Sequence, residues 1–102
     1  MTEDTELISS YAADGSEAAF AELTRRHVDL VYSAALRLVN GDVHSAQDVT
    51  QQVFTEVARQ AKRLARHPAL VGWLYTTTRL MAMRINRTEQ RRRTREQEAE
   101  TM

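Results

Sequence analysis

The spacing of apolar residues along the chain predicts helices over most of its length. From Glu17 onward, apolar positions recur every three or four residues for about six turns, and the stretch ends at Asn40-Gly41, a strong helix stop. A second stripe at the same spacing follows a tight turn and consists of Val49, Val53, Val57, Ala61 and Leu64. These stripes predict two long amphipathic helices.

A third stripe predicts the last helix, which follows a break at His67-Pro68. Its inward face is predicted to consist of Leu70, Trp73, Leu74, Thr77, Met81 and Ile85. Beyond Arg91 the apolar periodicity stops, so residues 91–102 are expected to fray or to be disordered.

A short helix and capping residues complete the predicted fold. Residues 5–12 predict a first helix, and Ser16 is a good N-cap for the next one. Asp42 or Ser45 is expected to cap the second long helix, with Asp48 three residues after Ser45 resembling a capping box. The predicted fold class is all-α: a compact bundle of three major helices plus a short N-terminal helix.

Composition supports one helical domain. The chain has 102 residues, one Pro and three Gly, so it has room for one core and few helix breakers. It has no Cys, which excludes disulfides and thiolate zinc sites and fits a reducing compartment. The absence of a long apolar run and the acidic beginning of the chain predict a cytoplasmic location.

The net charge of zero conceals a strong charge segregation along the chain. Residues 1–58 contain 10 acidic and 3 basic residues, whereas residues 59–95 contain 11 basic and 1 acidic residue. Charge runs are commonly no more than solvated surface, but here apolar and aromatic residues such as Trp73 and Tyr75 are interleaved with the arginines. A basic segment of this kind is suited to bind phosphates.

The second long helix carries a polar strip opposite its valine stripe. Its members lie at helical spacing and are Asp48, Gln51, Gln52, Thr55 and Arg59. A carboxylate with amides one turn away can receive arginine side chains from a partner helix, although an ordinary solvated face has the same composition. Phe54 lies next to the strip and is either a core residue or a partner contact.

Catalytic and metal-binding patterns are not found in the sequence. His27 falls on an apolar stripe, while His44 and His67 lie near turns, and none has a second ligand at metal-binding spacing. No phosphate-binding glycine loop or nucleophile-base arrangement occurs. We therefore expect neither an enzyme nor a cofactor.

Four segments together resemble region 2 of the extracytoplasmic-function (ECF) sigma factors, in the sigma-70 superfamily. They are Glu6-Leu7 through residues 14–20, Leu30-Val31-Tyr32, Asp48-Val49-Thr50-Gln51-Gln52-Val53-Phe54, and Gly72-Trp73-Leu74-Tyr75-Thr76-Thr77-Thr78-Arg79. The resemblance covers roughly residues 5–95. It implies a sigma region 2 fold and a role in transcription initiation.

The resemblance implies core RNA polymerase as a partner. In that family the second long helix meets the clamp helices of the beta-prime subunit, which points here to Asp48, Gln51 and Gln52, with Phe54 and Thr55 on the same helix. Many members carry Glu where this chain has Gln52, so a weaker contact with basic partner residues is expected. An anti-sigma factor is a further candidate partner.

The resemblance also implies that the loop before the last helix and that helix hold the non-template single strand of the promoter minus-ten element. Strand opening needs cations along the backbone and apolar walls for an unstacked base. The predicted DNA-binding residues are Lys62, Arg63, Arg66, Trp73, Tyr75, Thr76, Arg79, Leu80, Met83, Arg84, Arg87 and Arg91. Leu80 stands where many members carry Asn, and Asn86 either compensates or is simply exposed.

Two other functions remain open from the sequence. One is an autonomous helix-turn-helix protein that binds duplex DNA through the helix from Leu70, and the other is a protein-interaction bundle. The expected domain is residues 1–95, and residues 96–102 are expected to begin a linker to a second domain, which the resemblance implies.

Overall fold

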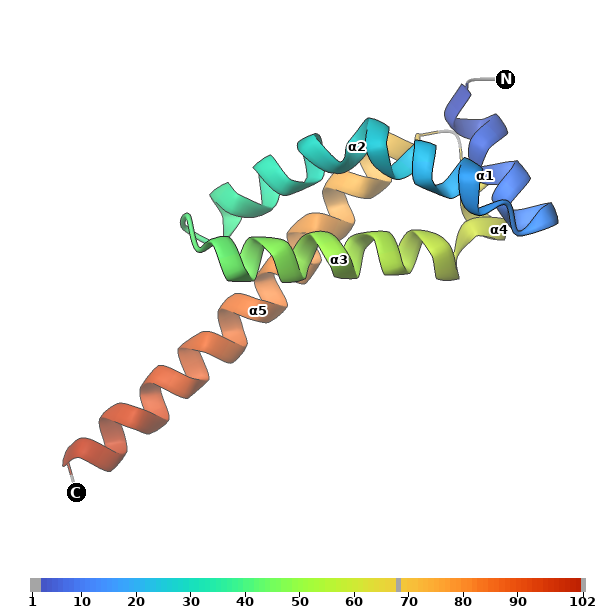
Figure 1. Cartoon of the computed structure of the whole chain (residues 1–102). Coiled ribbons are helices and arrows are strands. Elements are labelled where there is room, and N and C mark those ends of the chain that lie inside the picture. Colours follow the sequence, from blue (N-terminus) through green and yellow to red (C-terminus); the bar gives the residue numbers. More distant parts are fainter. Residues whose placement is uncertain (1–2, 68, 102) are drawn as a thin grey trace.

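The computed structural model describes residues 3–67 and 69–101, and this part of the chain contains helices and no strand (Figure 1). The helices are α1 (Glu3–Asp14), α2 (Glu17–Leu38), α3 (Val43–Arg59), α4 (Ala61–Leu64) and α5 (Leu70–Thr101). The all-α prediction is confirmed, with α4 as an additional short element. Pro68, to which the sequence assigned a break, lies outside the described residues.

The helices α2 and α3 lie antiparallel and side by side, α5 crosses them, and α1 and α4 meet at one end (Figure 1). Apolar side chains from all five helices fill the space between them. The fully buried members include Ile8, Leu23, Val31, Val53, Leu64 and Leu74. Burial of each such side chain contributes about 1.5–3 kcal/mol to folding, so this shared core fixes the relative positions of the helices.

The turn between α2 and α3 follows the expected stop. Asn40 and Gly41 have φ angles of 57° and 82°, and the Gly41 N–H donates to the Leu36 carbonyl at 2.8 Å. Asn and Gly tolerate this left-handed conformation better than other residues do, and the bond satisfies a carbonyl at the helix end. The two helices are thereby reversed in direction within four residues.

The structure shows which residues cap α2 and α3. Ser16 was predicted to cap α2, and the sequence left Asp42 and Ser45 as alternatives for α3. The Ser16 hydroxyl accepts a hydrogen bond from Ala19 N at 3.2 Å, as predicted. At the start of α3 the Asp42 carboxylate accepts from Ser45 N at 3.2 Å. Asp42 is therefore the cap, and Ser45 lies inside the first turn.

The valine stripe is buried as predicted. The prediction that one helix carries both the valines and the following Ala61 and Leu64 is wrong. Helix α3 ends at Arg59, and Gln60, with φ −104° and ψ 21°, separates it from α4. The change of direction lets Ala61 and Leu64 pack at the end of the bundle beside α1, and both are buried there.

The predicted inward face of α5 is confirmed, whereas the predicted fraying beyond Arg91 is not. Leu74 and Thr77 are buried, and the other four predicted residues pack against the core. Helix α5 continues to Thr101 and projects away from the bundle (Figure 1). The projecting part contains strong helix formers and ion pairs one turn apart, between Arg92 and both Glu89 and Glu96.

Polar contacts fasten α1 to α2. His27 Nε2 lies 2.8 Å from Asp4 Oδ2, and Arg26 Nη1 lies 3.4 Å from Asp4 Oδ1. Arg26 also contacts Glu3 and Glu22. These pairs explain how a histidine is accommodated on an apolar stripe.

Across residues 3–67 and 69–101, none of the helices has the length and apolar character required to span a membrane.

Candidate functional site

A polar ridge runs along the exposed side of α3. We call Asp48, Gln51 and Gln52 the α3 ridge. All three side chains are exposed, and within the described part of the chain they make no hydrogen bond or ion pair. The ridge lies opposite Val49, Val53 and Val57, each with 0% exposure. Because the valines anchor the helix, the three polar groups are held in place while they remain free to bind a partner.

The other two members of the predicted strip are engaged inside the chain. Arg59 holds Glu56 through two bonds, of 2.7 Å from Nη2 and 3.0 Å from Nε, and Gln60 Nε2 lies 2.7 Å from the same carboxylate. These hydrogen bonds lower the pKa of Glu56 to about 2. The Thr55 hydroxyl donates to the Gln51 carbonyl at 2.8 Å. Arg59 therefore stabilises the end of α3 and is not a free partner contact.

The ridge is flanked by two grooves. The α2–α3 groove is mostly apolar, and residues from its two walls include Phe20, Val28, Tyr32, Phe54 and Ala58. The α3–α5 groove is polar, and it is lined by Asp48, Gln52, Glu56, Met81 and Arg84 among others. Gln51 and Thr55 line both grooves. A partner helix lying on the ridge would therefore meet apolar surface on one side and polar surface on the other.

Phe54 is settled by the structure as a core residue. Its side chain is only 8% exposed and belongs to the hydrophobic core, although it also lines the α2–α3 groove. A partner can touch its edge only by entering this groove.

In the same groove, the Thr24 hydroxyl is buried and lacks a hydrogen-bond partner among the described residues, which leaves one unsatisfied polar atom in an apolar setting.

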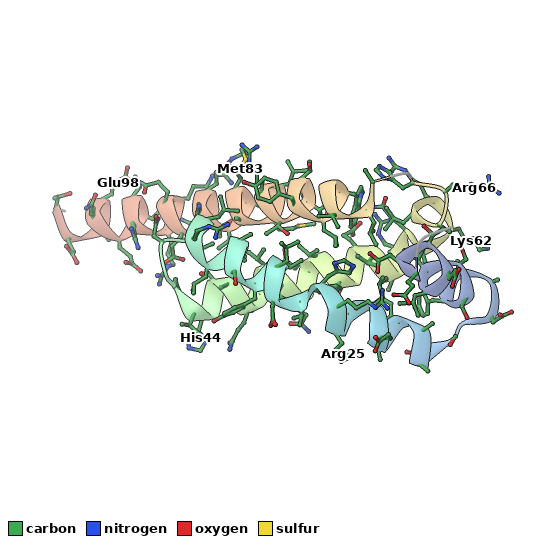
Figure 2. All side chains as sticks on the ribbon, turned by 90° about the horizontal axis from the view of Figure 1, so that it is seen from above. Arg25, His44, Lys62, Arg66, Met83 and Glu98 are labelled. Carbon is green, nitrogen blue, oxygen red and sulfur yellow. The ribbon has the colours of Figure 1, made fainter. Side chains whose placement is uncertain are left out.

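The outer face of α5 combines arginines with exposed apolar side chains. Tyr75, Leu80 and Met83 are each exposed by between 44% and 48%, and Met83 projects away from the bundle in Figure 2. The remaining predicted DNA-binding residues of α5 that are exposed are Thr76, Arg79, Arg84, Arg87 and Arg91. These eight residues form what we call the α5 outer face. It is suited to contact a nucleic-acid strand because it offers cations and apolar surface together.

The cations of α5 fall into paired and unpaired sets. Arg92 is held by Glu89 and Glu96, whereas the guanidinium groups of Arg79 and Arg87 have no ion pair within residues 3–67 and 69–101. Arg84 contacts the Met81 sulfur at 3.8 Å and lines the α3–α5 groove. The α3 ridge and the α5 outer face therefore meet at Arg84.

Comparison with known proteins identifies the family. The profile of sigma-70 region 2 matches residues 23–95, which is well over half of the chain. The chain belongs to the sigma-70 region 2 family. The ECF RNA polymerase sigma factor SigE of Mycolicibacterium smegmatis is 38% identical to it over 71 residues, which make up 67% of this chain and 27% of that protein. No solved structure matches the chain.

These similarities place the region 2 domain in the ECF group, as the sequence resemblance indicated. The chain spans only about a quarter of the length of the curated relative that it matches. The boundary expected at residue 95 is not marked by a break in the helix, since α5 runs on to Thr101, and a linker beginning at residue 96 stays a prediction.

In this region 2 domain, the predicted DNA contact Trp73 has a structural role, and so does Asn86, which the sequence left as either compensating for Leu80 or simply exposed. Trp73 is half-buried and packs against the core, so it supports the first turn of α5, and its direct contact with DNA stays a prediction. The Asn86 amide donates to the Leu38 carbonyl at 3.0 Å and so caps the end of α2. The bond occupies the Asn86 amide nitrogen, while the side chain is exposed, and compensation for Leu80 by Asn86 stays a prediction.

The region 2 sequence alone did not reveal the α2–α3 groove. Phe20 was assigned to an apolar stripe and Tyr32 to a family segment, but nothing in their spacing showed that a groove remains open between the helices.

The remaining predicted DNA contacts lie together on α4 and the following turn. They are Lys62, Arg63 and Arg66, and all three are exposed. Within the described residues, no group of three or more possible metal ligands is assembled.

Proposed function

We propose that this region 2 domain acts in transcription initiation by docking on core RNA polymerase through the α3 ridge, with the beta-prime clamp helices as its partner. The observation that carries this proposal is the exposed, unpaired set of Asp48, Gln51 and Gln52 on a helix fixed by its buried side. A carboxylate and two amides can accept several N–H donors from arginine or lysine side chains of a helical partner.

The α2–α3 groove supports a helical partner for this ridge. An apolar side chain projecting from the partner would enter beside Phe20 and Tyr32 and come to rest over Phe54. The docking surface thus combines charge-assisted hydrogen bonds on the ridge with apolar burial beside it, which is the usual composition of a specific interface.

We further propose that the α5 outer face holds the non-template single strand of the promoter minus-ten element. Unpaired Arg79 and Arg87 are placed to neutralise phosphates, and Tyr75, half exposed, offers an aromatic face for an unstacked base. Residues 1–58 carry an acidic excess that repels duplex DNA. Affinity of the isolated domain for DNA is therefore expected to be low until polymerase supplies the rest of the channel.

The helix-turn-helix alternative is weakened by the junction between α3 and α5. It extends over residues 60–69 and contains α4, whereas a DNA-binding helix-turn-helix uses a turn of about 3–4 residues. Tight binding to duplex DNA without polymerase, with a steep salt dependence, would nevertheless establish that alternative over our proposal.

Docking is tested with a fragment containing the beta-prime clamp helices. Asp48→Ala and Gln51→Ala are each expected to weaken binding by about tenfold, because each removes a charge-assisted contact. Gln97→Ala, an exposed amide on the projecting part of α5, is the matched control and should bind as the wild type does. Unchanged affinity in both ridge variants would refute docking through α3.

The DNA surface is tested with core polymerase and a promoter duplex that contains a pre-opened bubble. Arg79→Ala and Arg87→Ala should weaken the complex and reduce its salt dependence by about one counterion each. Arg25→Ala, which removes an exposed arginine on the side of α2 that lies away from α5 in Figure 2, is the control. If the α5 variants open and bind the promoter normally, the assignment of this face is wrong.

A further inference from the structure

Arg84 lies on the side of α5 that borders α3. At about 100° of rotation per residue, Arg84 is about 60° around the helix from Met81, which packs against the core, whereas Met83 is about 160° from it. Met83 accordingly projects away from the bundle (Figure 2), and Arg84 lines the α3–α5 groove together with Asp48. Arg84 therefore lies at the edge of the α5 outer face, on the side toward α3.

Contacts hold the Arg84 guanidinium over this groove. Its Nη1 lies 3.8 Å from the sulfur of Met81, which lines the same groove. Hydrogen bonds from Arg59 and Gln60 are the main cause of the low pKa of Glu56, about 2, and the charge of Arg84 contributes to the same shift. Because a Coulomb interaction weakens with distance, this contribution agrees with a guanidinium that faces α3.

The charge of Arg84 is not paired inside the chain. Its guanidinium forms no ion pair within residues 3–67 and 69–101. The carboxylate of Glu56 is occupied by hydrogen bonds from Arg59 and Gln60. Asp48 lines the groove as well, and it also forms no ion pair in the described part of the chain. The groove consequently presents a carboxylate and a guanidinium that do not pair with each other.

A partner that fits this groove carries charges of both signs. A cation alone would be attracted by Asp48 and repelled by Arg84, and like charges brought together across an interface weaken binding. A helix satisfies both groups when a basic and an acidic side chain lie three or four residues apart on one face. The acidic side chain can receive the planar guanidinium through two parallel hydrogen bonds.

We propose that Arg84 belongs to the polymerase-docking surface and binds a carboxylate on the partner helix whose basic side chain meets Asp48. This inference rests on the proposed docking through the α3 ridge, and it adds an acidic residue to what the partner offers. It moves Arg84 from the predicted DNA contacts to the docking surface. The unpaired Arg79 and Arg87 remain as cations for DNA on the α5 outer face.

Binding to the clamp-helix fragment without DNA tests this role. Arg84→Ala should weaken binding by about tenfold, and Arg84→Lys by less, because lysine keeps the charge but lacks the planar fork. Arg95→Ala, which removes an exposed arginine from the projecting part of α5, is the matched control and should bind as the wild type does. Circular dichroism checks that each variant is folded.

The ridge variants separate this inference from the proposed function. Unchanged affinity of Arg84→Ala, while Asp48→Ala and Gln51→Ala bind weakly, would overturn the inference and leave docking through the α3 ridge in place. If the two ridge variants also bind normally, the docking proposal fails with it.

Charge reversal tests the chemistry of the partner group. Arg84→Glu should bind the fragment more weakly than Arg84→Ala, because it brings two carboxylates together. Each exposed acidic residue of the fragment is then changed to lysine in turn, and one of these changes should restore the binding of Arg84→Glu. If none restores it, Arg84 does not meet a carboxylate and the proposal is wrong.

The competing role of Arg84 as a phosphate contact is measured on the bubble promoter with saturating core polymerase. Arg87→Ala should lower the salt dependence of binding by about one counterion, whereas Arg84→Ala should keep the wild-type value. An equal reduction by Arg84→Ala would assign this arginine to DNA and overturn the inference.

Discussion

Gln52 is the residue of the α3 ridge at which the family resemblance leads us to expect a carboxylate and this chain has an amide. The side chain is exposed beside Asp48 and lines the α3–α5 groove with Arg84. An amide both donates and accepts, so it binds basic groups less strongly than a carboxylate does. The ridge therefore carries one carboxylate, Asp48, and a glutamate at position 52 would give it a second.

Gln52→Glu should strengthen binding to the clamp-helix fragment by about two- to fivefold, the gain expected from one exposed ion pair. Isothermal titration calorimetry at low and high salt would measure it, and the gain should shrink at high salt. Gln97→Glu adds the same charge on the projecting part of α5 and should leave binding unchanged. Weaker binding of Gln52→Glu would show that this position does not face basic partner groups.

Asp42 gives a pH-dependent contribution to stability. The hydrogen bond from Ser45 N lowers the pKa of the Asp42 carboxyl. The ionised form is therefore favoured in the folded state, and its contribution is present above the ordinary carboxyl pKa and lost as pH falls through the lowered value.

Urea unfolding of Asp42→Ala should accordingly show a larger loss of stability at pH 7 than at pH 2. Ser16→Ala removes an uncharged N-cap, and its cost of about 1 kcal/mol should be the same at both pH values. An equal cost of Asp42→Ala at the two pH values would contradict the role of the ionised carboxylate.

At the scale of the elements, periodicity predicted the buried faces of α2, α3 and α5 because each face repeats over several turns. It did not predict the end of α3 at Arg59, since Ala61 and Leu64 continue the same apolar spacing. The end depends on the neighbouring α1, against which the short α4 packs. It also missed the helix beyond Arg91, because that part has no apolar face and depends on local propensity and ion pairs.

Two leucines of α5, one buried and one exposed, test which side of this helix packs against the core. Leu74 is 1% exposed and Leu80 is 48% exposed. Leu74→Ala should lower the free energy of unfolding by about 2–5 kcal/mol, whereas Leu80→Ala should change it by less than about 0.5 kcal/mol. Thermal or urea unfolding followed by circular dichroism measures both. Similar losses for the two variants would mean that the two sides of α5 are wrongly assigned.

At the scale of the whole molecule, the two proposed binding surfaces are neighbours. The α3 ridge and the α5 outer face meet at Arg84, and the core beneath them keeps their positions fixed. Helical spacing, a local property, correctly indicated that the residues of both surfaces lie on exposed helix faces, and their binding roles, which the family resemblance implies, stay predictions. The spacing did not predict the α2–α3 groove, because a groove depends on how closely two separate helices approach.

The most direct test is co-purification of the chain with core RNA polymerase. The account predicts that the wild-type chain and Gln97→Ala bind core polymerase, and that the double variant Asp48→Ala, Gln51→Ala binds at least about tenfold more weakly while circular dichroism shows the same folded helix content. Failure of the folded wild-type chain to bind core polymerase, or equal binding by the double variant, would contradict docking through the α3 ridge.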